Sequence, residues 1–313
     1  MLEIYYYDQG IKKAKIDEIE RLKDKKIWID THSLTKEEVA TLGKTLEIHE
    51  TTQEDLFNSN VRIKVEEFDN YLFCIFYGIK KNKGLEFHEL DFVIGKNFII
   101  SNHKKDLDSF EKLKKDKERL ESLFKEDVDS IFHELIDEEV DTYFPTLEEI
   151  DVQIEKLEED ATKKPNPKIL KEILKLKRDI ILGKRIVFQQ REKMSFLAKK
   201  EYKQISKSVL PYLRDVYDNT IRVSDSLDNS RELVANAYDI YMSTMNHKMN
   251  ETMKVMSVIA TIALPLTVLS SIYGTNFQIL PGATSPIGFW MMIATMLILS
   301  SGALIFFRRR GWF

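Results

Sequence analysis

The fold of this chain is decided by one stretch, Val255 to Phe307, which reads VMSVIATIALPLTVLSSIYGTNFQILPGATSPIGFWMMIATMLILSSGALIFF. No Asp, Glu, Lys or Arg occurs in it, although the 313-residue chain contains 47 basic and 51 acidic residues. An uncharged run of this length is typical of membrane-embedded sequence and excludes a purely soluble enzyme. It has room for two transmembrane helices and no more.

Glycine and proline divide this stretch into two predicted spans. The first runs from about 255 to 273 and the second covers 287–307, with an extracytoplasmic loop at 274–286 between them. At ~1.5 Å of rise per residue, each span crosses the ~30 Å hydrocarbon core of a bilayer. Basic residues flank the pair, at Lys254 and in the tail 308–313. Because positive residues stay on the cytoplasmic side, we expect a protein of the cell (inner or plasma) membrane with both termini in the cytoplasm.

Residues 1–103 are expected to form a cytoplasmic α+β domain. The expected elements are a helix at 35–46 and strands at 26–30, 61–65, 71–77, 85–94 and 97–101. Residues 104–210 have helical spacing, with acids concentrated in 126–160, bases in 163–214 and a proline turn between them. This pattern favours an antiparallel helix hairpin held partly by opposite charge, and its acidic surface is also suited to concentrating cations.

Several functions are excluded by composition and motifs. The net charge is −4, so no basic excess indicates nucleic acid as a partner. Cys74 is the single cysteine, which excludes an internal disulfide and a cysteine-rich metal site. The sequence contains no phosphate loop of the Gly-x-x-x-x-Gly-Lys type and no His-x-x-x-His pair, and we find no nucleophile–base set, so an enzyme is not expected.

A long stalk helix is expected over 211–273, continuing into the first span, because no Pro or Gly occurs between Tyr212 and Leu264. Its apolar positions, spaced by sevens and fours, indicate a coiled-coil-like seam: Val216, Val223, Leu227, Val234, Tyr241 and Met245. Such a helix needs neighbours, and copies of the same chain are the simplest ones.

One face of the first span carries small or weakly polar side chains, and the opposite face is apolar. The first face consists of Asn250, Met253, Ser257, Ala260, Leu264, Thr267 and Ser271, and the second of Val258, Ile262, Leu266 and Leu269. Two spans cannot enclose a channel, so a pore lined by the first face requires an oligomer. The same stripe equally suits a helix–helix contact of small residues. It contains no carboxylate, which excludes a strong intramembrane cation site made of carboxylates.

The segment Tyr273-Gly-Thr-Asn-Phe277 follows the span. Gly274 is expected to end the helix, after which the amide oxygen of Asn276 can turn towards an axis. Mg²⁺ dehydrates reluctantly and keeps several of its waters. A ring of neutral amide oxygens can bind those waters without removing them, which suits a hydrated divalent ion.

The first span and two other segments of the sequence resemble those of a known family. The run MKVMSVIATIALPLTVLSSIYGTNF, from Met253 to Phe277, resembles the pore helix of the CorA divalent-cation channels and transporters, and so do the ending FRRRGWF and the upstream PYLRDVYDNT. The resemblance covers most of the chain and implies a funnel-shaped homopentamer with the first span lining the pore. It also implies the following roles: Gly274, Thr275 and Asn276 as the selectivity motif, Asn250, Met253, Met256, Leu264 and Thr267 lining or gating the pore, and Asp239 facing the funnel.

The resemblance further implies gating by divalent ions bound between subunits in the cytoplasm. Asp55 would face Asp215 on a neighbour's stalk, and Glu54 and Asp137 would contribute to a second nearby site. Carboxylates from two chains repel each other until a hard cation bridges them. Mg²⁺ would then be both the transported ion and a regulatory ligand, and its loss would loosen the ring and open the pore.

Two departures from the family pattern leave alternatives open. Magnesium-transporting members carry Gly-Met-Asn, where this chain has Thr275, and the loop Gln278–Pro286 lacks the acids often found there. One interpretation is a Mg²⁺ channel that also passes Co²⁺ or Ni²⁺. Another is a ZntB-like Zn²⁺ transporter, with His247 as a soft ligand near the pore entrance. A third is a membrane-anchored metal sensor or scaffold that conducts nothing.

Overall fold

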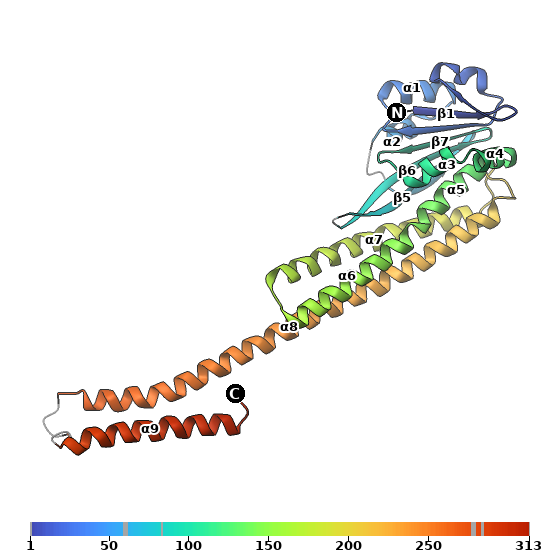
Figure 1. Cartoon of the computed structure of the whole chain (residues 1–313). Coiled ribbons are helices and arrows are strands. Elements are labelled where there is room, and N and C mark those ends of the chain that lie inside the picture. The colour runs from blue at the N-terminus through green and yellow to red at the C-terminus, as the bar shows by residue number, and fades with distance from the viewer. Residues whose placement is uncertain (1, 59–61, 83, 277–279, 283–284, 313) are drawn as a thin grey trace. The chain divides into compact units, whose positions relative to one another are not determined.

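The computed structural model describes residues 2–58, 62–82, 84–276, 280–282 and 285–312 (Figure 1). Contacts between residues divide the chain into two units, Met1–Tyr238 and Asp239–Phe313. The first unit contains a sheet with its covering helices and a helical bundle. The second unit is a pair of apolar helices.

Among the described residues, a seven-stranded sheet forms the centre of the first unit. Its strands, in spatial order, are β2 (Ile11–Ala14), β1 (Leu2–Tyr7), β3 (Ile27–His32), β7 (Phe98–His103), β6 (Leu85–Gly95), β5 (Tyr71–Lys81) and β4 (Lys64–Glu67). The neighbours β3 and β7 are parallel, with Ile29 opposite Ile100, and the other neighbouring pairs are antiparallel. The long hairpin of β5 and β6 places Phe73 opposite Val93.

Helices cover both faces of this sheet. They are η1 (Ile16–Leu22), α1 (Lys36–Thr45), α2 (Glu50–Phe57), α3 (Asp108–Lys115), α4 (Lys117–Glu126) and α5 (Val128–Asp141). Figure 1 shows α1 and α2 on one side and α3 and α5 on the other. Successive strand residues point to opposite faces, so Val93 packs in the core that contains α1 and α2, whereas Phe92 lies 6.5 Å from Phe110 and 5.1 Å from Phe132, between ring centroids. Both faces are therefore packed with apolar side chains, and polar residues such as Asp30, Asp91 and Asn102 are buried on the same strands.

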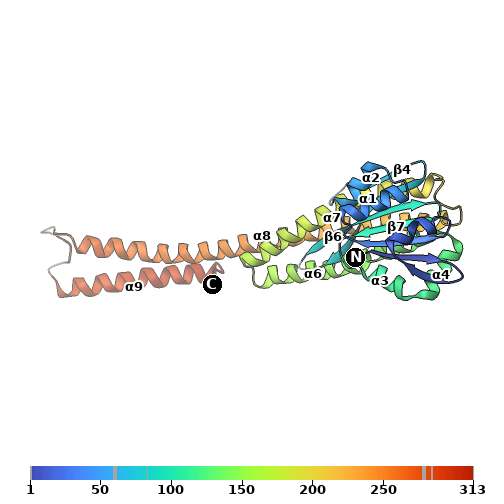
Figure 2. The ribbon, with the colours of Figure 1, turned by 90° about the horizontal axis from the view of Figure 1, so that it is seen from above.

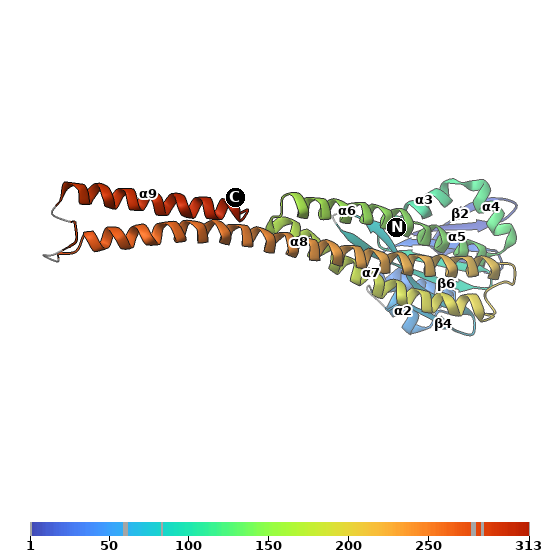
Figure 3. The ribbon, with the colours of Figure 1, turned by 90° about the horizontal axis from the view of Figure 1, so that it is seen from below.

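A three-helix bundle extends the first unit. Helices α6 (Tyr143–Lys163), α7 (Pro167–Lys199) and the first part of α8 (Leu210–Tyr273) lie side by side (Figures 1 and 3). The predicted proline turn separates α6 from α7, where the Asn166 side chain accepts a hydrogen bond from the backbone N–H of Lys168 at 2.9 Å and Pro167 occupies the first turn. The acidic segment is not one helix, because α5 ends at Asp141 and α6 begins at Tyr143.

Helices of the same chain cover most of the predicted seam of α8. Val216, Val223, Leu227 and Val234 are each at most 1% exposed. The Ser230 hydroxyl donates to Asp151 of α6 at 2.6 Å, and a Cβ built on Gly183 of α7 would lie 3.4 Å from the Leu227 side chain. The expectation that copies of the chain cover this seam is therefore wrong for these four positions. Of the other two predicted seam residues, Tyr241 is buried and Met245 is exposed.

The second unit is an antiparallel helical pair. The remainder of α8 and helix α9 (Pro286–Arg309) lie side by side in all three ribbon views (Figures 1–3), and both helices have the length and apolar composition to cross a membrane. Ser285 caps α9, because its hydroxyl accepts from the backbone N–H of Ile287 at 3.3 Å. The backbone at Gly282 approaches Gly288 so closely that only glycine fits there, since a Cβ on residue 288 would collide with the backbone carbonyl of Gly282.

Each of the five predicted strands overlaps a strand of the sheet. The strand predicted at 61–65 begins at Lys64, and residues 59–61 lie outside the described residues, as do 277–279 and 283–284 of the predicted loop. Strands β1 and β2 were not predicted. The sequence LEIYYY has no alternation of apolar and polar residues, and IKKA is short and half charged, so neither carries the period-two signal of a strand.

Candidate functional site

The stripe predicted on the first span is exposed along its whole length. All of its members are exposed in the chain, with Met253 at 60% and Leu264 at 62%. The opposite face is the one that packs, because Val258 is 7% exposed and Ile262, Leu266 and Leu269 are half-buried. The side chains predicted to line a pore therefore lie away from the face of α8 that its own partner helix covers.

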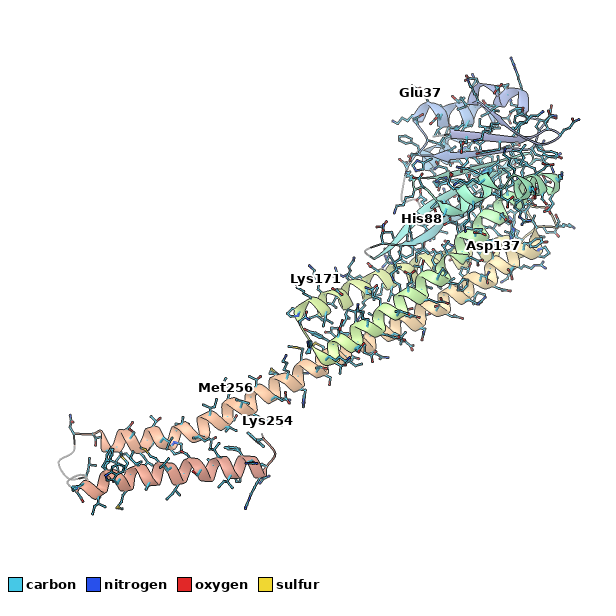
Figure 4. All side chains as sticks on the ribbon, viewed as in Figure 1. Glu37, His88, Asp137, Lys171, Lys254 and Met256 are labelled. Atoms are coloured by element: carbon cyan, nitrogen blue, oxygen red, sulfur yellow. The ribbon has the colours of Figure 1, made fainter. Side chains whose placement is uncertain are left out.

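The other residues predicted at or near the pore are also exposed. Met256, which lies beside the stripe, is 61% exposed and is labelled on α8 in Figure 4. Asp239 is exposed on α8 at the start of the second unit. His247 is exposed as well, and its Nε2 lies 3.4 Å from a carboxylate oxygen of Glu251, one helical turn away. That carboxylate would remain beside any metal ion that His247 bound.

Hydroxyl groups on the second part of α8 and just past its end present oxygen lone pairs to their surroundings. The Thr267 hydroxyl donates to the backbone carbonyl of Ala263 at 2.9 Å, and the Thr275 hydroxyl donates to that of Ile272 at 2.7 Å. Each oxygen has used its hydrogen within the helix and keeps its capacity to accept. Waters around a cation point their hydrogens outwards, so a surface of acceptors without formal charge suits a hydrated divalent ion.

The Gly-Thr-Asn motif lies immediately past the end of α8. The helix ends at Tyr273, as predicted, and the backbone N–H of Gly274 still donates to the carbonyl of Ser270 at 3.0 Å. The Tyr273 hydroxyl donates to the backbone carbonyl of Pro281 at 3.1 Å, which ties the connection between the helices back to α8. Asn276 is exposed just beyond this tie.

Three carboxylates of the first unit influence one another electrostatically, and the sequence analysis had singled out two of them. Asp137 and Asp141 lie one turn apart on α5, and Asp215 on α8 acts electrostatically on both (Asp137 is labelled in Figure 4). Burial, together with the negative charges of Asp141 and Asp215, raises the pKa of the Asp137 carboxyl to about 6. Burial and the charge of Asp215 also raise the pKa of Asp141. The cluster is therefore costly when fully ionised.

One oxygen of this cluster lacks a partner. Oδ1 of Asp137 is shielded from solvent and makes no hydrogen bond to any described residue. A buried carboxylate oxygen without a donor is satisfied by a proton or by a cation, and hard cations such as Mg²⁺ prefer carboxylate and water oxygens. The residues therefore fit a divalent ion, although no group of three His, Cys, Asp or Glu in the described part of the chain is arranged to hold a metal by itself.

Asp55 and Glu54 lie on α2, in a different environment. The Asp55 carboxylate forms a hydrogen-bonded ion pair with Lys64 at the start of β4, and both side chains are 21% exposed. Burial lowers the pKa of Lys64, but its hydrogen bonds to Asp55 and Glu66 outweigh this and raise the pKa overall. Glu54 is exposed. A metal ion binding at Asp55 must therefore displace Lys64, a competitor that the sequence did not reveal.

Asp141 was also missed by sequence reasoning. The available signal was its spacing, because residues four apart lie on one face of a helix, and Asp137 had already been chosen. Asp55 and Asp215 both lie in the first unit, and no interaction between them appears within the described residues of the chain.

Comparison with known proteins agrees with these features. The family model described as "CorA-like Mg2+ transporter protein" matches residues 23–309. The chain is 32% identical over 293 residues to the cobalt/magnesium transport protein CorA of Thermotoga maritima, covering 91% of this chain and 83% of that protein. It is 25% identical over 305 residues to the putative metal ion transporter YfjQ of Bacillus subtilis, covering 97% and 95%.

A solved structure shares the fold over the full length. The complete structure of the CorA magnesium transporter from Methanocaldococcus jannaschii matches with a TM-score of 0.85 at 24% identity, covering 100% of this chain and 99% of that one. The combination of an α/β domain, a long helix and two apolar C-terminal helices is thus the CorA fold. The matched family is one of transporters and is not a class of enzymes. The chain therefore belongs to the family of CorA-like Mg²⁺ transporter proteins.

Proposed function

We propose that this chain transports divalent cations across a membrane through a pore lined by the exposed face of α8. The observation that carries the proposal is the uncharged stripe of small or weakly polar side chains on α8, which the chain leaves exposed, with Leu264 at 62%, whereas Val258 on the opposite face is 7% exposed. The charge-free acceptors suit a hydrated ion of the Mg²⁺ kind. The names of the relatives, a cobalt/magnesium transport protein and a magnesium transporter, support Mg²⁺ first and Co²⁺ as well.

The pore requires several copies of the chain, because two spans cannot surround an axis. We take the assembly to be the funnel-shaped homopentamer that the family resemblance implies, embedded in the inner or plasma membrane with both termini in the cytoplasm. Asn276 forms the outer selectivity ring, together with the backbone of Gly274 and Thr275. Asn250, Met253, Met256, Leu264 and Thr267 line or gate the pore below it, and Asp239 faces the funnel.

Gating in this proposal depends on the carboxylates of the cytoplasmic unit. The three-acid cluster repels itself when ionised, and Asp137 Oδ1 lacks a donor, so a bound divalent ion relieves both costs. The remaining ligands come from waters and from Glu54 and Asp55 of a neighbouring subunit. High internal Mg²⁺ then holds the subunits together, and low Mg²⁺ releases them and opens the pore.

Ion flux into liposomes containing the purified chain tests the transport proposal. A Mg²⁺-sensitive dye and a Zn²⁺-sensitive dye are used in parallel, with Asn276→Ala as the pore variant and Thr295→Ala on α9 as the matched control. We expect Mg²⁺ entry that Asn276→Ala reduces at least about tenfold, as expected when a dominant ion-binding group is lost, and that Thr295→Ala leaves unchanged. Entry that survives Asn276→Ala unchanged contradicts the assigned selectivity ring.

The same experiment decides between the alternatives. Zn²⁺ entry without Mg²⁺ entry supports a ZntB-like Zn²⁺ transporter, for which the departure from Gly-Met-Asn at Thr275 is the specific reason. Absence of flux for both ions, from a chain shown to be folded in the liposomes, supports the metal sensor or scaffold. Native mass spectrometry in detergent tests the assembly, with five copies as the expected result.

Protection from proteolysis tests the gating sites separately. We expect Mg²⁺ to slow trypsin cleavage of the wild-type cytoplasmic unit, and Asp137→Asn combined with Asp215→Asn to abolish most of that protection. Asp218→Asn is the matched control, because Asp218 is exposed on the same helix and lies outside the three-acid cluster. Equal protection of the double variant and the control removes these residues from the gating mechanism.

A further inference from the structure

Helix α7 has an apolar and basic face that the described helices of the chain leave exposed. The face is made of positions three and four residues apart: Lys171, Leu174, Arg178, Ile181, Arg185 and Phe188. All six side chains are exposed, with Ile181 at 42% and Phe188 at 54% (Lys171 is labelled in Figure 4). Apolar side chains that recur every seven residues, as Leu174, Ile181 and Phe188 do, are typical of a helix that packs against another helix.

The exposed surface of α7 is also strongly positive. Its exposed positions carry six bases and two acids, namely Lys168, Lys171, Lys175, Arg178, Arg185 and Lys199 against Glu172 and Glu192. Glu192 follows Phe188 on the same face and is already paired with Lys193 at 3.7 Å. Lys171, Arg178 and Arg185 form no ion pair with any described residue. The positive charge of the basic face is therefore not balanced within the chain and favours an acidic partner.

A matching acidic face occurs on α6. It consists of Pro145, Glu148, Val152, Glu155 and Glu159, again three and four residues apart and all exposed, with Val152 at 65%. The exposed positions of this helix carry five acids and two bases, namely Glu148, Glu149, Glu155, Glu159 and Asp160 against Lys156 and Lys163. Glu159 is paired with Lys163, whereas Glu148 and Glu155 form no ion pair with any described residue. The acidic face therefore complements the basic face of α7 in charge and has an apolar side chain at its centre.

The two faces cannot pair within one chain. The side of each helix that packs in the bundle, with Ile154 of α6 and Ile180 of α7, is at most 1% exposed, and the charged faces lie away from it. Figure 3 shows α2 and β4 on the side of α7, and α3 and α4 on the side of α6. An ion pair of 2.7 Å between Lys200 and Glu67 holds the end of α7 beside β4. The complementary faces thus lie on opposite flanks of the first unit, which is the arrangement that a head-to-tail ring requires.

These flanks are also the ones that carry the carboxylates proposed to control gating. Asp55 lies on α2, on the flank of α7, whereas Asp137 lies on α5, which α6 follows directly. An arrangement that brings Asp55 of one chain to Asp137 of the next therefore also brings α7 to the α6 of that next chain. We infer that the basic face of α7 packs on the acidic face of α6 in a second copy of this chain. The inference rests on the assembly described under the proposed function and specifies a contact within it.

The turn between the two helices sets the register of this contact. Helices α6 and α7 run in opposite directions from the turn at Pro165, so residues equally far from Pro165 along the chain lie at one level (Figure 1). Val152 and Arg178 are equally far from it. In a ring whose axis runs along the helices, Arg178 meets Val152 of the neighbouring copy, with Glu148 and Glu155 one turn away on either side.

Disulfide cross-linking of the full-length chain in detergent tests the contact. The double variant Val152→Cys with Arg178→Cys is oxidised mildly and separated without reductant, while native mass spectrometry shows whether the chain is assembled. The native Cys74 is buried and should not take part. We expect a ladder of linked chains from the double variant and none from either single variant. Val152→Cys with Glu172→Cys is the matched control, because Glu172 is exposed on α7 away from the basic face, and it should link at least about tenfold less.

Charge reversal distinguishes the role of the charges from proximity alone. Arg185→Glu, added to the double variant, should slow the cross-linking at least about threefold, because it places a second acid beside Glu148 of the neighbouring copy. Adding Glu148→Arg should restore the rate. A variant that had only lost stability would not be rescued by this second substitution.

Several outcomes would overturn the inference. An assembled chain whose double variant forms no cross-link does so and leaves the basic face to another partner, such as an acidic helix of a different protein. Equal linking of the control pair also does so, because it would indicate random collision. A rate that Arg185→Glu leaves unchanged removes the charges from the contact. A monomeric chain contradicts both this contact and the proposed assembly, whereas a cross-linked ladder without ion flux contradicts transport alone.

Discussion

The two parts of α8 differ in what covers them. From Leu210 to Tyr238 the helix buries Val216, Val223, Leu227 and Val234 against helices of its own chain. From Asp239 to Tyr273 it leaves most of its side chains exposed, and among them only Tyr241 and Val258 are buried. The first part is complete in a single chain. The second exposes an apolar surface that is stable only in lipid or against other copies.

The largest expected effect comes from substituting one leucine in each part. Leu227→Ala should lower the free energy of unfolding by about 2–5 kcal/mol, because a fully buried leucine leaves a cavity. Leu264→Ala, at a position 62% exposed in the chain, should change it by less than about 0.5 kcal/mol while altering ion flux. Thermal denaturation of the full-length chain in detergent measures both. Similar losses for the two variants would show that assembly buries Leu264 as tightly as the bundle buries Leu227.

Two glycines of α9 make a second matched pair. Gly288→Ala should destabilise the helical pair by about 1–3 kcal/mol, because the added Cβ would collide with the backbone carbonyl of Gly282. Gly302→Ala meets nothing within 4 Å and should be neutral or stabilising by up to about 1 kcal/mol. Thermal stability of the detergent-solubilised chain distinguishes them. A destabilising Gly302→Ala would reveal a neighbouring copy packed on that part of α9.

The third effect depends on pH. The pKa of Asp137 is raised to about 6 in the folded chain, from an ordinary value of 3.8, so the folded state holds a proton that the unfolded state has lost. Its contribution to stability is complete below pH 4 and is lost as the pH rises through 6. Asp137→Asn should therefore stabilise the chain at pH 7 by about 1 kcal/mol, a value reduced for partial exposure, and by almost nothing at pH 4.

Unfolding midpoints at pH 4 and pH 7, without divalent ions, check this prediction. Asp218→Asn, on the exposed side of α8, is the control and should show no such difference between the two pH values. An equal gain from Asp137→Asn at both pH values would mean that the amide helps by packing and not by removing charge. Saturating Mg²⁺ should erase the gain at pH 7 if the cluster binds the ion.

The smallest effect concerns an ion pair between α7 and α8. Lys184 forms a hydrogen-bonded pair with Asp228, and their side chains are 37% and 46% exposed. Lys184→Met should cost less than about 0.5 kcal/mol, because exposed pairs gain little in high dielectric. Measured by the same denaturation, a loss near that of Leu227→Ala would show that charge, and not apolar packing, holds the first part of α8.

The two faces of the second part of α8 could be distinguished from sequence. The helical period separated an apolar face, with Val258, Ile262 and Leu266, from a stripe with Ser257 and Leu264. The pattern left open which of the two packs on another helix, and in the structure the apolar face is the less exposed one. The first part could not be predicted equally well. A heptad seam shows that some helix covers it, but the pattern is the same whether the partner belongs to the chain or to a copy.

Prediction of the carboxylate sites was limited in the same way, because the sequence does not show which elements come together. Asp137 and Asp215 were found through the family resemblance, and the structure brings both into one cluster with Asp141. The ion pair of Asp55 with Lys64 was not predictable, since it joins a helix to a strand across residues with no regular spacing. The periodicity within one helix or strand indicates which of its faces is covered. Contacts between residues of different elements depend on the tertiary fold.

The tie between Tyr273 and Pro281 has a consequence for how the protein enters a membrane. The hydroxyl bond at 3.1 Å joins Tyr273 to Pro281, and Gly288 approaches Gly282 closely, so two contacts link described residues between the end of α8 and the start of α9. Only residues 274–285 separate α8 from α9 along the chain, a connection short enough to place the second helix alongside the first in a bilayer. We therefore expect the two helices to insert as one hairpin, so that no state with a single inserted helix needs to be stable. An antiparallel hairpin that inserts in this way has both of its ends on the same side of the bilayer.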